Sequence, residues 1–192
     1  IKEYYNSEKN HDVLILGDCE VYENISTVTM WENYGISSYI RGSAEQLIWQ
    51  SYYLLEDTLK YEKPQVVILN VLAMTESDAK NEAYNRMTLD GMKLSKYKIA
   101  SIRESMTEEE NMASYIFPLL RYHSRWSELS SEDFRYMWKT PSVTTNGYLM
   151  QKGVRPVTTI PKAAPLANYT FSDRNMEYLD KIDSLCKDNG IN

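Results

Sequence analysis

The chain has 192 residues, of which 43% are hydrophobic, and this is enough for one domain with a buried core. Its net charge of −6 argues against a nucleic-acid partner, because a phosphate backbone requires a basic surface. No apolar stretch is long enough to span a bilayer, and two cysteines are too few for a disulfide framework.

Three short apolar runs, residues 13–16, 36–40 and 66–69, are typical of buried β-strands. A helix is expected between the second and third runs. It would start at the capping-box sequence of residues 43–46 and end near Tyr61, before Lys63-Pro64. Strands that alternate with helical connections predict a parallel sheet with right-handed crossovers.

Residues 75–140 predict a helical insertion that packs over the C-terminal edge of this sheet. We expect helices over residues 81–92 and 95–105, and a third after the capping box that begins at Thr107. A fourth, short helix is expected between Ser130 and Trp138. Such insertions commonly build substrate pockets, because the rigid sheet positions whatever they cover.

Residues 141–170 predict an irregular or β-ribbon excursion, with Asn146-Gly147 as a turn. An amphipathic helix follows from Asp173 to about Asp188, with Cys186 on its apolar face, and Asn189-Gly190 is a typical helix end. Ile191 would then begin another parallel strand. We therefore expect a single, C-terminally truncated domain over residues 1–192. The alternative is a natural three-stranded domain that ends in a helix.

Small and polar residues follow each predicted strand: Gly17-Asp18-Cys19, then Arg41-Gly42-Ser43, then Asn70. In these places the sequence resembles the SGNH/GDSL hydrolase superfamily, with Cys19 at the serine position, Gly42 at the glycine position and Asn70 at the asparagine position. The C-terminal Asp-x-x-His block of the family is not found. The resemblance covers roughly the first half of such a domain, and it implies an α/β fold with a three-layer, flavodoxin-like parallel sheet.

The resemblance also implies acyl-transfer chemistry. Cys19 would attack an ester carbonyl, and its own N–H, that of Gly42 and the Asn70 amide would hold the oxyanion. The flanking Asp18 and Glu20 would lie beside the substrate, and their negative charges disfavour a thiolate. Because the histidine base is also missing, we expect the chain as given to be inactive.

Further substrate contacts are expected from the insertion. His123 either packs in the core or reaches the cleft with Arg121 or Arg125, where these groups would bind an anionic or sugar substrate. The other histidine, His11, is expected to be exposed at the opposite end of the sheet. Neither a zinc or calcium motif nor a glycine-rich phosphate loop occurs in the sequence, so no cofactor is predicted.

The leading hypothesis is an SGNH-like hydrolase or acyltransferase that acts on acyl esters, with acetyl esters of bacterial cell-envelope carbohydrate as the substrates that the resemblance implies. The start at Ile1 without a methionine suggests a removed N-terminal signal or anchor and an extracytoplasmic location, although a cytoplasmic one stays open. The alternative is a non-catalytic carbohydrate-binding or interaction module on the same fold. A third hypothesis is an unrelated flavodoxin-like domain whose glycines only serve turns.

Overall fold

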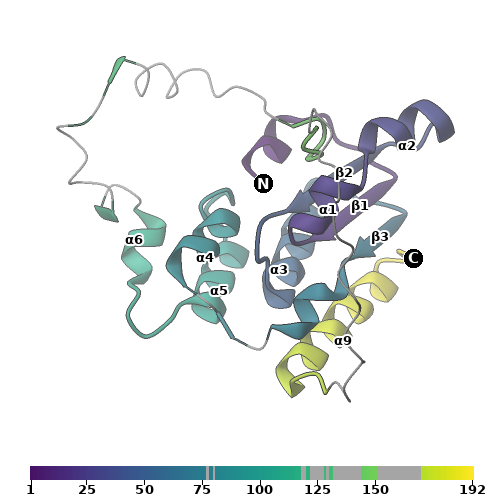
Figure 1. The fold of residues 1–192 in the computed structure, drawn as a ribbon. Helices are drawn as coiled ribbons and strands as arrows, with labels where there is room; N and C mark the ends of the chain where they lie inside the picture. Colours follow the sequence, from purple (N-terminus) through teal and green to yellow (C-terminus); the bar gives the residue numbers. More distant parts are fainter. Residues whose placement is uncertain are drawn as a thin grey trace, which may run out of the picture.

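The computed structural model describes residues 1–76, 78–79, 81–117, 120–121, 128, 130–131, 144–150 and 170–192. Three strands form a parallel sheet in the order β2-β1-β3: β1 (Val13–Gly17), β2 (Ser38–Gly42) and β3 (Val66–Leu69) (Figure 1). The predicted parallel α/β fold is confirmed. All five residues of β1 are buried because this strand lies between the other two.

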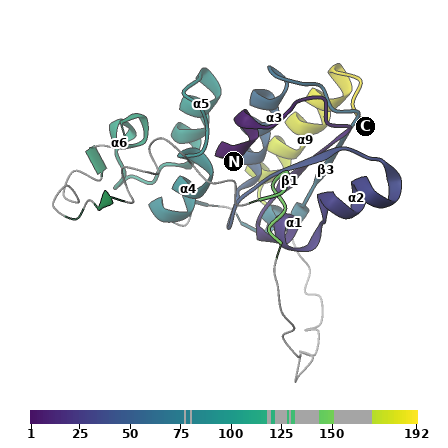
Figure 2. The same cartoon turned by 90° about the horizontal axis from the view of Figure 1, so that it is seen from above.

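Helices cover both faces of the sheet (Figure 2). The β1–β2 connection forms α1 (Cys19–Asn24) and α2 (Thr27–Tyr34), which lie on one face. The opposite face is covered by α3 (Ile48–Thr58) and by α9 (Asp173–Asp188). Side chains alternate along each strand, so β1 supplies apolar groups to both layers. Towards α1 lie Val13 and Ile15, and towards α3 lie Leu14 and Leu16.

The predicted start of α3 is wrong by about four residues, because the capping box does not form. The Ser43 hydroxyl contacts Gln46 Oε1 at 3.2 Å and Thr88 Oγ1 at 2.5 Å instead of a backbone N–H. Glu45 adopts a left-handed conformation with φ +54°, which breaks the helical path before Ile48. The helix also ends at Thr58 rather than near Tyr61.

Three helices follow β3 and a short 3-10 turn, η2 (Val71–Thr75). They are α4 (Glu82–Leu89), α5 (Lys96–Ser105) and α6 (Met112–Ile116). Asn81 and Ser95 cap α4 and α5, close to the predicted starts. The third helix starts later than predicted, because the Thr107 hydroxyl bonds to the Glu110 side chain. The fourth predicted helix lies almost entirely outside the described residues.

Hydrogen bonds between buried polar side chains attach α4 and α5 to α3. The Trp49 indole N–H donates to Ser105 Oγ at 3.0 Å, and Gln50 Nε2 donates to the same oxygen at 3.1 Å. Gln50 also donates to Asn85 Oδ1, and Asn85 Nδ2 donates to the Ser105 carbonyl at 2.7 Å. A fully satisfied buried network of this kind fixes the relative positions of the helices that contribute to it.

Residues 144–150 lie along the outer edge of β2. Thr145 and Tyr148 form an antiparallel bridge around Asn146 and Gly147, whose φ angles are +50° and +85°, so the predicted turn is confirmed. The Ile40 N–H donates to the Asn146 carbonyl at 2.9 Å, which satisfies part of the strand edge. The rest of the predicted excursion lies outside the described residues.

The end of α9 leads back to the sheet. The Asn192 N–H donates to the Gln65 carbonyl at 3.0 Å, and the Val67 N–H donates to the Asn192 carbonyl at 2.8 Å. These two bonds have the pattern of a parallel ladder, as predicted for the residues after Gly190. Cys186, which we expected to be buried on the apolar face of α9, is only half-buried, and it is not bonded to Cys19. In the described part of the chain, no helix is both long and apolar enough to cross a bilayer.

Candidate functional site

The turns that follow the three strands meet at the C-terminal edge of the sheet. The Asn70 N–H donates to the Leu16 carbonyl at 2.9 Å, and the Ser43 N–H donates to the Gly17 carbonyl at 3.3 Å. A Cβ atom on Gly17 would lie 2.5 Å from Asn70 Cβ, and a Cβ atom on Gly42 would lie 3.0 Å from the Gly17 carbonyl oxygen. Only glycines allow these backbones to approach so closely.

Cys19 is the first residue of α1, directly after the turn of β1. The preceding Asp18 is buried and caps this helix, because its side chain accepts a hydrogen bond from the Glu20 N–H at 3.0 Å. Cys19 itself is half-buried. Its position gives the thiol access to the edge of the sheet and to the backbone N–H groups of the first helical turn.

The electrostatic surroundings of Cys19 favour the neutral thiol. Burial raises the pKa of Cys19, and the negative charges of Asp18, Glu23 and Glu20 raise it further. A hydrogen bond from the residue's own N–H acts in the other direction but does not outweigh them. The thiol is therefore mostly protonated at neutral pH, and reaction with an ester needs a base.

The Asn70 side chain is held in a fixed orientation at this edge. Its Oδ1 accepts a hydrogen bond from the Leu72 N–H at 2.7 Å and so caps η2. Since the oxygen is used in this way, the amide NH₂ group is the part of the side chain that can donate to a ligand. No hydrogen-bond partner of that NH₂ group occurs in the described part of the chain.

A cavity of about 650 Å³ adjoins Gly42. Most of its lining is apolar, and it includes Tyr22, which lies one helical turn after Cys19. Met87 of α4 and Leu149 of the segment beside β2 form other parts of the wall. Gly42 and Ser43 are the residues of the sheet edge that line this cavity, whereas Cys19 and Asn70 do not line it.

The remaining predicted substrate residues are not gathered at this edge. Glu20 is exposed and accepts a hydrogen bond from Asn24 Nδ2. Arg121 donates to Glu82 Oε1 at 3.1 Å and lines a different hollow, beside α4. His123 and Arg125 lie outside the described residues.

Two buried polar side-chain pairs on the α3 side of the sheet were not predicted from the sequence. His11 is buried rather than exposed, and its Nδ1 lies 2.9 Å from a carboxylate oxygen of Glu62. Arg41 of β2 is fully buried and forms an ion pair with Asp57 of α3 at 3.1 Å. The only signal for the second pair is an arginine within an otherwise apolar strand, which requires a buried anion.

Comparison with protein-family models, with curated proteins and with solved structures found no match for this chain. Among the described residues, no cluster of three or more histidine, cysteine or acidic side chains could hold a metal ion. The functional interpretation is therefore built on the geometry of the sheet edge.

Proposed function

We propose that this chain is an SGNH-type α/β domain of an acyl-ester hydrolase or acyltransferase, and that Cys19 takes up the acyl group at the C-terminal edge of its sheet. One observation supports the proposal above the others. The turn before Cys19 is in backbone contact with the turn that contains Gly42 and with the turn that begins with Asn70, all at the same edge of the sheet. Open parallel sheets bind their ligands beyond the carboxyl ends of the strands. Bacterial cell-envelope carbohydrate esters, outside the cytoplasm, are the substrates that the sequence resemblance suggests.

The proposed reaction begins when a base takes the proton of the Cys19 thiol, and the resulting thiolate attacks the ester carbonyl carbon. The S–C bond forms while the negative charge moves to the carbonyl oxygen. The Asn70 amide and the backbone N–H groups of Cys19 and Gly42 donate hydrogen bonds to that oxygen. The carbonyl then re-forms and the C–O bond to the alcohol breaks. The departing oxygen takes the proton back from the base, which leaves an S-acyl group on Cys19 and a free alcohol.

A non-catalytic binding module on the same fold is the second candidate. The raised pKa of Cys19 favours it, because a nucleophilic cysteine usually lies in surroundings that lower its pKa. Such a module would bind the same class of esters or carbohydrates at this edge without forming a covalent bond.

Competition between the two cysteines distinguishes the candidates. Cys186 is also half-buried and its pKa is also raised by burial, so it is an internal reference thiol. The protein is treated with limiting 4-nitrophenyl acetate, and acetylation of each cysteine is followed by peptide mass spectrometry. Parallel reactions with iodoacetamide measure how accessible each thiol is and what fraction of it is thiolate, because alkylation needs no oxyanion donors. The acetylation rate of each cysteine is divided by its alkylation rate.

We expect Cys19 to be acetylated about a hundredfold faster than Cys186 after this correction. Asn70→Ala should remove most of that advantage, since one oxyanion donor is worth roughly a hundredfold or more in rate. Asn33→Ala removes an exposed amide of α2 and serves as the control that should change nothing. Equal acetylation of both cysteines, or an advantage that survives Asn70→Ala, would favour the binding module.

A further inference from the structure

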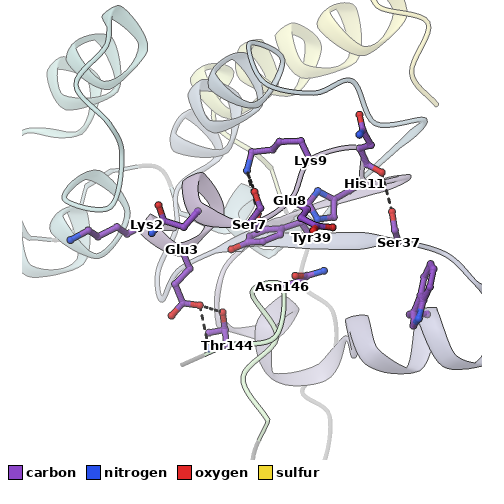
Figure 3. A pocket seen from close by; sticks show the side chains of 13 residues that line it. Lys2, Glu3, Ser7, Glu8, Lys9, His11, Ser37, Tyr39, Thr144 and Asn146 are labelled. Carbon is purple, nitrogen blue, oxygen red and sulfur yellow. Dashed lines mark hydrogen bonds between the residues drawn. The ribbon is translucent and has the colours of Figure 1, made fainter. Parts of the chain in front are cut away.

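A second cavity of about 650 Å³ lies around the amino-terminal half of β2. Figure 3 shows the side chains that surround it. They come from the first eleven residues, from α2 and β2, and from the segment 144–150. It shares Lys2, Glu3 and Thr144 with the cavity beside Gly42, but none of Cys19, Gly42 and Asn70 lines it.

Tyr39 is a buried residue whose polar group is available to a ligand in this cavity. The residue is only 2% exposed, and its ring packs edge-to-face against Tyr4 and His11. Its hydroxyl has no hydrogen-bond partner among the residues that the structure describes. In Figure 3 this hydroxyl lies on the side of Ser7 and Glu3. Burial and the negative charge of Glu3 raise the pKa of Tyr39, so the hydroxyl is a neutral donor.

The charged side chains around the cavity are balanced. Lys2 and Lys9 carry two positive charges, and Glu3 and Glu8 carry two negative ones. The Lys9 ammonium group donates hydrogen bonds to the carbonyls of Tyr4 and Ser7, so it is less available to bind an anionic ligand. A phosphate or other anion would need an excess of positive charge, so this composition favours an uncharged ligand.

Neutral donors and acceptors make up much of the remaining wall. Three asparagines, Asn6, Asn10 and Asn146, offer amide groups there. The Asn146 NH₂ group donates to the Ser38 carbonyl, so its Oδ1 is the atom left to accept from a ligand. Side-chain amides and hydroxyls are the groups that bind the hydroxyls of a polar, uncharged molecule.

An exposed tryptophan completes the site. Trp31 of α2 lines the cavity and is 61% exposed, which is unusual for so large an apolar ring. An indole face beside a wall of neutral polar groups matches the apolar C–H face and the polar rim of a pyranose ring. We propose that this cavity is a binding site for an uncharged saccharide, which stacks on Trp31 and accepts a hydrogen bond from Tyr39.

The test uses the whole chain and three neutral disaccharides, namely cellobiose, maltose and chitobiose. Binding is followed by the NMR shifts of the Ser37 and Asn146 backbone amides, with inorganic phosphate as the charged comparison. We expect saturable shifts with at least one disaccharide and none with phosphate. Trp31→Ala and Tyr39→Phe should each weaken binding at least fivefold. Tyr34→Ala should leave it unchanged, because Tyr34 is a 74% exposed aromatic residue of α2 that does not line the cavity.

Three results would overturn the proposal: no saturable shift with any of the disaccharides, equal binding by the Trp31→Ala variant, or a stronger response to phosphate. The Tyr39→Phe variant keeps the ring and its packing, so loss of binding there cannot be ascribed to unfolding. This test is independent of the acyl-transfer proposal, since the Cys19→Ala variant should bind saccharide as well as the unmodified chain does.

Discussion

The carboxylate of Glu62 connects the residues before β1 to the segment between α3 and β3. Its oxygens accept hydrogen bonds from the Tyr4 hydroxyl at 2.8 Å, the Asn10 N–H at 2.7 Å and the His11 N–H at 2.9 Å. His11 Nδ1 lies 2.9 Å away as well. Burial alone would raise the pKa of Glu62, but these hydrogen bonds outweigh burial and lower the pKa from 4.5 to about 2.

Replacing Glu62 with Gln should therefore destabilise the protein at neutral pH. A tenfold change in proton affinity is worth about 1.4 kcal/mol, so the lowered pKa corresponds to about 3 kcal/mol of folding free energy. Because the folded pKa lies below the unfolded one, this contribution is complete above pH 4.5 and is lost as the pH falls towards 2. Urea unfolding of the two proteins at about pH 7 and about pH 2.5 measures it.

Glu56→Gln is the matched control on α3. Burial raises the pKa of Glu56, so its charged form opposes folding at neutral pH and the neutral amide should cost little. We expect a change within about 0.5 kcal/mol for this variant. A loss below about 1 kcal/mol for Glu62→Gln at neutral pH, or the same loss at both pH values, would refute the reasoning.

Other expectations concern the sheet edge and the buried ion pair. Gly42→Ala should cost about 2 kcal/mol in urea unfolding, since its Cβ would lie 2.6 Å from a valine methyl of α1. Gly190→Ala, which meets no atom within 4 Å, should cost only about 1 kcal/mol. Asp18→Asn keeps the helix cap but removes a charge that raises the pKa of Cys19, so alkylation of Cys19 by iodoacetamide at mildly alkaline pH should accelerate. Asp57→Asn should cost about 3 kcal/mol or more because it leaves a buried arginine without its anion, and a thermal unfolding scan would show whether it does.

The strands were predictable from the sequence because their signal is local. Each is a short apolar run followed by glycine or asparagine within two residues, and the structure places β1 and β3 within one residue of the predicted ranges. The second strand, predicted over residues 36–40, lies two residues later, at Ser38–Gly42. The start of α3 was not predictable in this way. Whether Ser43 caps a helix depends on Thr88, which is 45 residues away and competes for its hydroxyl.

The candidate site was predictable at the level of the backbone but not of the side chains. That Gly17, Gly42 and Asn70 meet follows from the parallel topology, which the alternation of strands and helices indicates. The burial of His11 was missed because a polar leader gives no sign that Glu62, 51 residues later, will enclose it. Long-range ionic partners of this kind leave no periodic pattern in a sequence.

The most direct test of the proposed acyl chemistry is the burst of 4-nitrophenolate released from excess 4-nitrophenyl acetate at alkaline pH. The account predicts about one equivalent per chain for the unmodified protein and for Cys186→Ala, and none for Cys19→Ala. It also predicts a slow phase no faster than that of Cys19→Ala, because the Asp-x-x-His block that would supply the base is not found in the sequence and steady turnover needs one. A burst that persists in Cys19→Ala, or one that is lost only in Cys186→Ala, would contradict the assignment of Cys19 as the nucleophile.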